Sequence, residues 1–267
     1  MKSIVEKKLE TAFSLKPLLK KEGEEQYSFL EQSEEGKVSD WFDKIKHIVK
    51  KYPKFYKFLI YTISPVHVNF YGKVRKFLKS FPEDSLVLNI GSGASDVFEG
   101  TVNVDLFPYE HVNVVCDASN LPLKDETCEG VLSIALLEHV PNPKKFVSQM
   151  HRVLKSNGRV LVFVPFMQGF HASPHDYNRW TESGCLELFF EFSDIKVTVA
   201  EGPTSAMLWI FQEWLAQLLS FGIVPLYKFL FFVLMLITWP IKFLDLLLRY
   251  HPMAKNITAG FIIEAKK

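Results

Sequence analysis

The sequence predicts an α/β fold built on a mostly parallel sheet, and two observations support this. From Ser85 onward, short apolar segments alternate with stretches of helical periodicity. The apolar segments are nearly continuous, which is typical of parallel strands that are covered on both faces. The strands that we expect are 86–90, 101–105, 112–116, 129–134, 159–164, 194–200 and 258–264.

Two helical segments fit between these strands. Residues 143–154 are amphipathic. Residues 181–191 begin at Thr181, whose hydroxyl can accept a hydrogen bond from an unpaired N–H of the first helical turn. Helices at these positions would help to cover the sheet.

The first 80 residues differ in character from the rest. Residues 1–36 mix Lys with Glu around sparse apolar positions, which is typical of a solvated helix or a poorly ordered arm. Residues 37–80 crowd lysines among aromatic residues, and Pro53 and Pro65 divide them into short helices. We expect four parts: a helical, basic and aromatic extension (1–80), an α/β core (81–205), an apolar helical insertion (206–250) and the last strand of the core sheet (251–267).

Composition narrows the class of protein. A formal net charge of +1 over 267 residues favours no particular partner. The three cysteines are scattered singly, without a CxxC pair, so a disulfide framework or a zinc site is not expected and a reducing compartment is the simplest interpretation. The first ten residues, MKSIVEKKLE, contain no apolar signal core, so secretion is not indicated.

A Gly-Ser-Gly turn follows the first expected strand. Gly91 and Gly93 allow positive φ angles and close approach of a ligand, and the turn would lie at the sheet edge where open α/β sheets bind nucleotides. The third glycine of the dinucleotide fingerprint is missing, because 94–96 read Ala-Ser-Asp. Taken alone, the turn is equally consistent with an ordinary connection between strands.

Two carboxylates strengthen the interpretation as a ligand site. Asp105 ends the second strand, where it can accept both hydroxyls of a ribose, and Asp117 follows the third strand, where it can accept an adenine amino group. A single aspartate would more simply be a turn former. The glycine turn and the two aspartates lie at the carboxyl ends of three successive strands, and together they favour an adenosine-binding site.

Residues 86–180 resemble the class I S-adenosylmethionine-dependent methyltransferases, especially the methyltransferase type 11 group. The resemblance rests on VLNIGSG, VNVDL, CDASNLPLKDETCEGVLSIALLEHVPNP and MHRVLKSNGRVLVFVPF. It implies a Rossmann-like seven-stranded sheet and S-adenosylmethionine as cofactor. It places Gly91 and Gly93 under the methionine part, Asp105 at the ribose, Asp117 and Ala118 at the adenine and Ala135 along the cofactor, with Ser92 and Leu106 beside them.

One position departs from the family. Asn89 stands where the family usually has an acidic residue, so it would offer the methionine ammonium a hydrogen bond without a charge. We still expect it to belong to the cofactor site.

A loop after the fifth strand, PFMQGFHASPHDYNRWT, is the expected acceptor side. Methyl transfer mainly requires alignment of acceptor and methyl group, and a hydroxyl acceptor is helped by a base, for which His171 or His175 is suited. Asp176 could orient a histidine, Arg179 could hold an anion, and both are expected with Tyr177 at the acceptor. The pattern PHDYxRWT is similar to that of some bacterial methyltransferases of surface-polysaccharide pathways.

The same loop allows a metal alternative, which we do not favour. The spacing of His171 and His175 suits metal ligands, but no third ligand is evident in the sequence, so no metal site is expected. His139 is interpreted as a packing residue or a contact of the methionine part rather than as a base.

Residues 206–250 form a long apolar insertion before the last strand. Its uncharged part, Phe229 to Ile241, would span about 20 Å as a helix, against roughly 30 Å of hydrocarbon. A single membrane span is excluded if both flanking strands belong to one sheet. The insertion is then a helical hairpin in one leaflet, an oligomer or lid interface, or a buried core against 37–80. The membrane is favoured, because a soluble monomer would struggle to cover so many Phe and Leu side chains.

The sequence thus predicts a methyltransferase bound to the cytoplasmic, inner face of a membrane as a peripheral or monotopic protein. The expected acceptor is amphiphilic: a lipid-linked sugar, an isoprenoid or a quinone head group. The alternatives are a soluble small-molecule or nucleotide-sugar acceptor, a non-catalytic membrane scaffold and, less favoured, a dehydrogenase. A nucleic-acid partner ranks lower, because the basic stretch lacks an RNA-binding motif.

Overall fold

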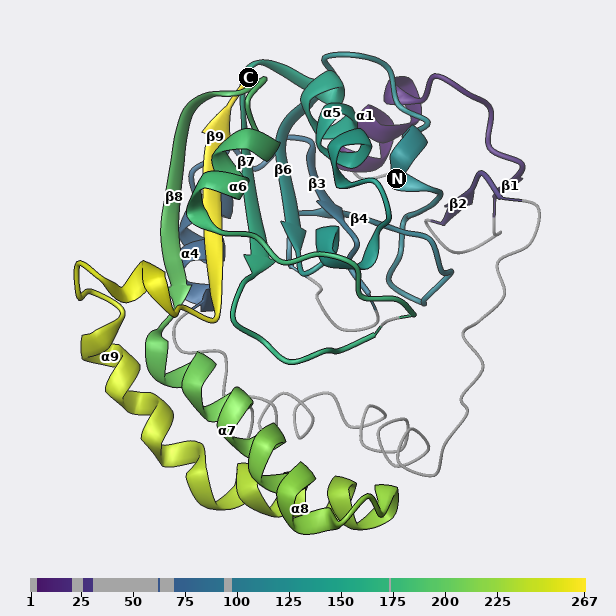
Figure 1. Cartoon of the computed structure of the whole chain (residues 1–267). Helices are drawn as coiled ribbons and strands as arrows, with labels where there is room; N and C mark the ends of the chain where they lie inside the picture. The colour runs from purple at the N-terminus through teal and green to yellow at the C-terminus, as the bar shows by residue number, and fades with distance from the viewer. Residues whose placement is uncertain (1–3, 21–25, 31–61, 63–69, 94–97, 173) are drawn as a thin grey trace.

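The computed structural model describes residues 4–20, 26–30, 62, 70–93, 98–172 and 174–267. These residues form one sheet with helices on both faces (Figure 1). The strands are β1 (Leu19–Lys20), β2 (Tyr27–Ser28), β3 (Val87–Ile90), β4 (Val102–Asp105), β5 (Val114–Val115), β6 (Cys128–Ile134), β7 (Leu154–Pro165), β8 (Ser193–Glu201) and β9 (Gly260–Lys266).

The sheet confirms the predicted α/β class and corrects the strand count. Its order is β1-β2-β5-β4-β3-β6-β7-β9-β8, and the seven strands from β5 to β8 correspond to the predicted seven. Neighbours from β5 to β7 run parallel, whereas β9 runs antiparallel to both β7 and β8. Nine strands are present because β1 and β2 extend the β5 edge.

The expectation of a solvated helix or poorly ordered arm in residues 1–36 is wrong where the chain packs on the sheet. Tyr27 is 2% exposed, and its strand pairs in parallel with β5. Helix α1 (Ile4–Ala12) also contributes buried Leu9 and Ala12. These few apolar side chains anchor a segment that is otherwise rich in charge. The short helices predicted within 37–61 and 63–69 lie outside the described residues.

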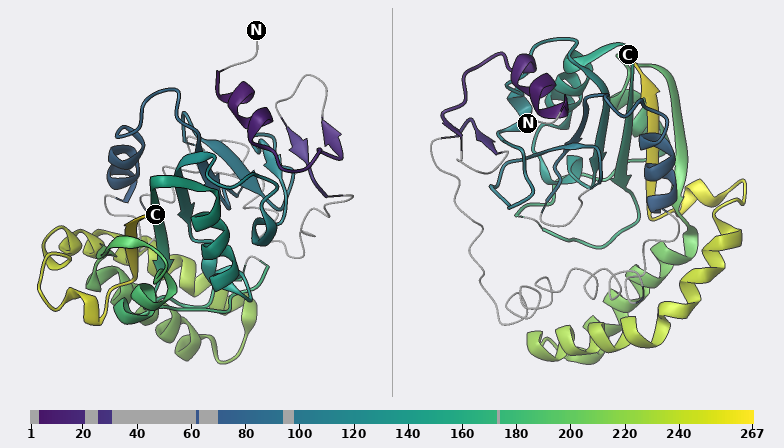
Figure 2. Two further views of the ribbon diagram at one scale, coloured as in Figure 1. Left: turned by 90° about the horizontal axis from the view of Figure 1, so that it is seen from above. Right: turned by 180° about the vertical axis from the view of Figure 1, so that it is seen from behind.

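Helices cover the sheet from both sides. One buried cluster joins the strands to α1, to α5 (Pro143–Val153) and to α6 (Glu182–Leu188), and a second joins β6, β7, β8 and β9 to α4 (Phe70–Leu78). The views from above and from behind show that α4 lies on the opposite side of the sheet from α5 and α6 (Figure 2). The Thr181 side chain caps α6 as predicted, because it accepts a hydrogen bond from the Gly184 N–H.

The three cysteines are buried and unpaired with one another. Burial raises the pKa of Cys116, Cys128 and Cys185 to about 12. The thiols therefore stay protonated at neutral pH and are unsuited to act as nucleophiles.

The predicted insertion between β8 and β9 is a helical hairpin. Helix α7 (Pro203–Ser220) leads away from the sheet, and α8 (Val224–Thr238) returns through η3 (Trp239–Leu244) and α9 (Asp245–Leu248) (Figure 1). Three short 3-10 turns, η1 (Ala118–Asn120), η2 (Leu137–His139) and η4 (Ala254–Asn256), complete the described elements.

The hairpin contains one run, Val224–Leu248, that is long and apolar enough to cross a membrane by length and composition. The helical run continues past the uncharged part that ends at Ile241, and Lys242 and Asp245 within it are buried against the protein. A single membrane span was excluded on the premise that both flanking strands belong to one sheet. This premise holds, since β8 and β9 pair side by side. A single crossing would separate these two strands.

A buried aspartate closes the base of the hairpin. The Asp245 carboxylate, which is 0% exposed, accepts hydrogen bonds from the Thr204 and Ser205 N–H groups at 2.8 Å each, and from the Ser205 hydroxyl at 2.7 Å. The start of α7 is thereby capped by a residue from the far end of the hairpin. A Cβ on Gly202 would lie 2.3 Å from an Asp245 oxygen, so glycine is required there.

We expect Asp245→Asn to lower the free energy of unfolding by about 2 kcal/mol, because the amide keeps one oxygen acceptor and turns its NH₂ group toward one of the two N–H donors. Urea unfolding followed by circular dichroism measures the change. Asp125→Asn is the control, since Asp125 is an exposed partner of Arg152 and should change stability by less than about 0.5 kcal/mol. Equal stability of the two variants would contradict this role of Asp245.

Candidate functional site

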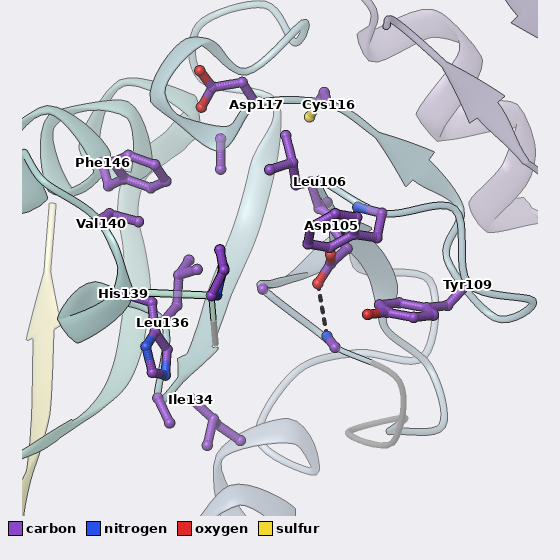
Figure 3. Close-up of a pocket in the computed structure, with 17 residues that line it drawn as sticks. Asp105, Leu106, Tyr109, Cys116, Asp117, Ile134, Leu136, His139, Val140 and Phe146 are labelled. Atoms are coloured by element: carbon purple, nitrogen blue, oxygen red, sulfur yellow. Dashed lines mark hydrogen bonds between the residues drawn. The ribbon is translucent and has the colours of Figure 1, made fainter. Parts of the chain in front are cut away.

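A cavity of about 270 Å³ opens at the carboxyl edge of β3, β4, β5 and β6 (Figure 3). Its walls include seven of the nine residues that the sequence predicts for the cofactor: Gly91, Gly93, Asp105, Leu106, Asp117, Ala118 and Ala135. The carboxyl ends of parallel strands bring together these residues, which are far apart in the sequence.

The two other predicted residues do not line the cavity. Asn89 is 1% exposed within β3, where its amide NH₂ donates to the Asn103 side chain at 2.9 Å. Ser92 is fully buried. Asn89 therefore supports the sheet below the cavity, and its expected contact with a methionine ammonium stays a prediction.

The Gly-Ser-Gly turn is held in the conformation that its glycines allow. Gly91 has φ +75°, and a Cβ there would lie 2.9 Å from the Leu136 side chain. Gly93 has φ +58°, and its N–H donates to the Asp105 carboxylate at 2.8 Å (Figure 3). His111 binds the Gly93 carbonyl at 2.8 Å. The turn is fixed from both sides before any ligand arrives.

The two predicted carboxylates come from neighbouring strand ends. Asp105 also accepts the Phe107 N–H at 3.0 Å, so both of its oxygens are oriented by backbone groups and still have lone pairs for further donors. Asp117 caps η1 by accepting the Ser119 N–H at 2.8 Å. Leu106, Val140 and Phe146 add apolar walls to the same cavity.

Ala135 is strained at the cavity wall. It has φ +51° at the end of β6, a conformation that non-glycine residues seldom adopt. Such backbone strain costs on the order of 1–3 kcal/mol and is concentrated at functional sites. The turn directs the chain into Leu136, which lines the cavity and was not predicted to do so. It also leads to His139, which lines the cavity and for which a contact of the methionine part was one of the two interpretations.

The predicted acceptor loop places His171 beside a buried carboxylate. Glu138 on η2 is 0% exposed, and one of its oxygens, Oε1, lies 3.7 Å from His171 Nε2 and 3.8 Å from His139 Nε2. Burial opposes a charge on His171, but the Glu138 carboxylate and the Gly169 carbonyl outweigh it and raise the pKa of His171. Glu138 was not predicted, because nothing in the sequence marks it as close to His171.

Asp176 and Arg179 bind each other rather than standing open to an acceptor. The guanidinium pairs with both Asp176 oxygens and donates to the Gly169 carbonyl at 3.0 Å. Asp176 also accepts the His171 N–H at 2.8 Å, so it orients the histidine backbone. The hydrogen bond from Arg179 lowers the pKa of Asp176 to about 2, although burial of the carboxyl group raises it. The pair therefore fixes the loop, and the expected anion contact of Arg179 would need this pairing to open.

His175 and Tyr177 are exposed on the loop surface, with ring centroids 5.5 Å apart. The structure does not bring the His175 side chain to His171. Its backbone carbonyl accepts a hydrogen bond from His139 Nδ1 at 2.6 Å.

The acceptor loop contacts the base of the hairpin. The Trp209 ring on α7 lies 5.6 Å from the His171 ring, centroid to centroid. A Cβ on Gly169 would lie 2.5 Å from Trp209 Nε1, so the indole packs directly on the loop backbone. The site and the hairpin are therefore in physical contact.

Comparison with known proteins identifies the core. Residues 75–162 match the family described as "Methyltransferase domain". This part of the chain is a class I S-adenosylmethionine-dependent methyltransferase domain. The methyltransferase domain contains the Gly-Ser-Gly turn, Asp105, Asp117 and the η2 residues, and its cofactor is S-adenosylmethionine.

Relatives resemble this chain only in part. It is 26% identical over 140 residues to a human probable tRNA methyltransferase 9B, covering 45% of this chain and 31% of that protein. It is 30% identical over 109 residues to an Arabidopsis thaliana tRNA (carboxymethyluridine(34)-5-O)-methyltransferase, covering 34% of this chain and 27% of that protein. The chain thus spans about a third of the length of these two relatives.

A solved S-adenosylmethionine-dependent methyltransferase from Archaeoglobus fulgidus is 17% identical, with a TM-score of 0.49 over 85% of this chain and all of that one.

The residues of the methyltransferase domain fit this cofactor. Gly91 and Gly93 leave the cavity floor free of side chains, and two carboxylates stand at its edge between apolar walls. A carboxylate that keeps free lone pairs suits ribose hydroxyls, and the apolar walls suit an adenine ring. The bound cofactor would supply a methyl group on a positively charged sulfur.

Proposed function

We propose that this protein is a methyltransferase that acts on an amphiphilic acceptor at the cytoplasmic face of a membrane. The observation that carries the proposal is the contact between Trp209 and the loop of Gly169 and His171. Through it, a helix with several large exposed apolar side chains is packed on the acceptor side of the methyltransferase domain. An acceptor with a polar head and an apolar tail would suit these adjoining surfaces.

A helix of a soluble protein usually buries its apolar side chains and exposes its polar ones, and most side chains of α7 are arranged the other way round. Apart from Leu208, its buried residues are small or polar, including Ala206, Gln212, Ala216 and Ser220. In contrast, the large side chains of Met207, Phe211, Trp214 and Leu218 are 42–57% exposed. The Gln212 amide donates to the Thr238 hydroxyl of α8 at 2.6 Å. Small residues and a polar bridge between helices, with large apolar residues outside, are typical of helices in lipid.

The tip of the hairpin supports the same partner. Residues 214–227 carry no charged side chain, and Phe221, Ile223 and Val224 are 54–86% exposed. In α8 only Thr238 is fully buried among the residues whose burial is described. A protein partner would need one matching groove, whereas hydrocarbon covers such a surface from every side.

The chain's own residues have distinct roles in this proposal. Asp105 and the glycine turn hold the cofactor, and the apolar walls exclude water around it. Asp176 and Arg179 fix the loop that presents His171 toward the acceptor side. Alignment of the acceptor oxygen or nitrogen with the methyl carbon is the main requirement of this reaction.

A second candidate acceptor is RNA, because two relatives are named as tRNA methyltransferases. The matches cover less than half of this chain, and the acceptor loop contacts the apolar hairpin through Trp209. We therefore favour the amphiphile.

One labelling experiment tests the proposal. The full chain is incubated with methyl-labelled S-adenosylmethionine and, separately, with a total lipid extract in vesicles, with nucleotide sugars and with total RNA. We expect label in the lipid fraction, and loss of that label with Asp105→Ala. Label in RNA or in a nucleotide sugar would overturn the amphiphilic acceptor. Absence of both labelling and cofactor binding would indicate a non-catalytic scaffold.

A further inference from the structure

The Glu138 carboxylate lies in an environment that normally excludes a lone charge. It is 0% exposed, and neither oxygen accepts a hydrogen bond from the residues that the structure describes. A buried carboxylate without hydrogen bonds is costly, so something further is expected to neutralise it. Its nearest polar neighbours are two ring nitrogens, Nε2 of His139 and Nε2 of His171, at 3.8 and 3.7 Å.

Both histidines are turned the same way by backbone carbonyls. His139 Nδ1 lies 2.6 Å from the His175 carbonyl, and His171 Nδ1 lies 3.0 Å from the Gly169 carbonyl. A carbonyl only accepts, so each Nδ1 carries the hydrogen. Arg179 also approaches His171 Nδ1, at the longer distance of 3.3 Å, while its hydrogens are directed to Asp176 and Gly169. In the neutral rings, both Nε2 lone pairs therefore face Glu138.

Two lone pairs and a carboxylate oxygen that face one another repel unless a proton on one ring or a metal cation lies between them. The three ligand atoms lie within 4.8 Å of one another, and the two measured nitrogen–oxygen distances are too long for hydrogen bonds. Atoms that each lie about 2.1 Å from a metal ion can be at most about 4.2 Å apart, so a small contraction would complete the site.

We propose that Glu138, His139 and His171 bind a divalent transition-metal cation of the Zn²⁺, Mn²⁺ or Fe²⁺ type. Two imidazoles and one carboxylate are ligands that these ions accept, and a Nδ1–H bound to a backbone carbonyl is the usual support of a metal-binding histidine. This set differs from the histidine pair that sequence spacing offers, because His175 contributes its carbonyl to His139 and keeps its ring outside.

The site would be open on the side of the cavity. His139 lines the cavity beside Ala135 and Leu136, whereas Glu138 closes the opposite side. Three protein ligands leave at least one coordination position, which is typical of metal sites that bind water or a substrate oxygen. The ion would thus lie between the cofactor cavity and the acceptor loop. Its binding goes beyond the proposed function and is measured without cofactor or acceptor.

Metal binding to the full chain tests the proposal. The protein is treated with a chelator, dialysed, and titrated separately with Zn²⁺, Mn²⁺ and Co²⁺, using calorimetry and, for Co²⁺, visible absorption that reports histidine coordination. We expect one equivalent to bind, with affinity lowered at least 10-fold in Glu138→Gln, His139→Ala and His171→Ala.

His175→Ala is the matched control, because it removes a neighbouring histidine ring and keeps the carbonyl that orients His139. We expect it to bind metal like the wild type. Melting curves of the chelated variants show whether each is folded, and Glu138→Gln preserves the shape of the site if an alanine variant is not. A wild-type chain that binds none of the three ions, or that loses as much affinity through His175→Ala as through His171→Ala, would overturn the site.

Discussion

Replacing Asp105 with alanine is expected to weaken the binding of S-adenosylmethionine and of its demethylated product about 100-fold, equal to roughly 2.7 kcal/mol. The substitution removes the carboxylate proposed for the ribose hydroxyls, and each charge-assisted hydrogen bond contributes about 1.5–3 kcal/mol. It also releases the Gly93 N–H, which Asp105 accepts at 2.8 Å, so the glycine turn loses one support. Calorimetry with the demethylated product gives the dissociation constant without turnover.

Two further variants separate these effects. Asp105→Asn keeps one oxygen acceptor and should lose affinity about 10-fold, between the wild type and the alanine variant. Asp125→Ala removes an exposed carboxylate that pairs with Arg152 and should bind the cofactor normally. Unchanged affinity in Asp105→Ala would mean that the ribose is held elsewhere.

Charges at the hairpin tip are expected to remove membrane binding. The triple variant Leu218→Asp, Phe221→Asp and Val224→Asp changes side chains that are 55, 86 and 60% exposed. A charge at mid-membrane costs about 2.5–3.5 kcal/mol on insertion scales. If each substitution costs only a third of this free energy, the three together lower vesicle partitioning about 100-fold. Phe221 has φ +50°, a conformation that aspartate tolerates, so the turn is expected to survive.

Flotation with vesicles of a bacterial-type lipid mixture measures the partitioning. The control is Leu186→Asp with Phe190→Asp, because these side chains are 43 and 66% exposed on and just after α6, away from the hairpin. The control should float like the wild type. If the tip variant floats equally well, or if it only converts an oligomer into a monomer, the apolar surface is a protein interface and the membrane proposal fails.

The sheet could be predicted because its signal is local. Near-continuous apolar runs mark buried parallel strands, and β3 and β6 are indeed buried along almost their whole length. The two edge strands could not be found this way, since Leu19–Lys20 and Tyr27–Ser28 are two residues each and owe their pairing to contacts with β5 and to the burial of Tyr27. Such short strands have no periodicity to detect.

The residues of the cavity could be predicted because they follow the ends of strands. Gly91, Asp105 and Asp117 are each placed by the register of a neighbouring strand. Asn89 does not line the cavity, because a residue inside a strand faces the ligand or the packed interior according to its side of the sheet. Glu138 and Trp209 were missed, because their contacts with His171 join segments distant in sequence and leave no local pattern.

The hairpin shows where charge counting along a sequence misleads. Lys242 and Asp245 follow the uncharged part that ends at Ile241, yet both are buried, and Asp245 caps α7. Their placement follows from the return of the chain to the sheet, which the sequence indicates only through the strands on either side.

The pairing of Glu201 with Gly260 at the end of β8 and β9 brings the two ends of the whole insertion next to each other. The hairpin can therefore be gained or lost in a single evolutionary event, because its excision leaves a gap that an ordinary tight turn can close. The same geometry makes the element portable: it could be grafted between the last two strands of a relative without altering the order of that sheet, and the graft would transfer the proposed membrane binding with it.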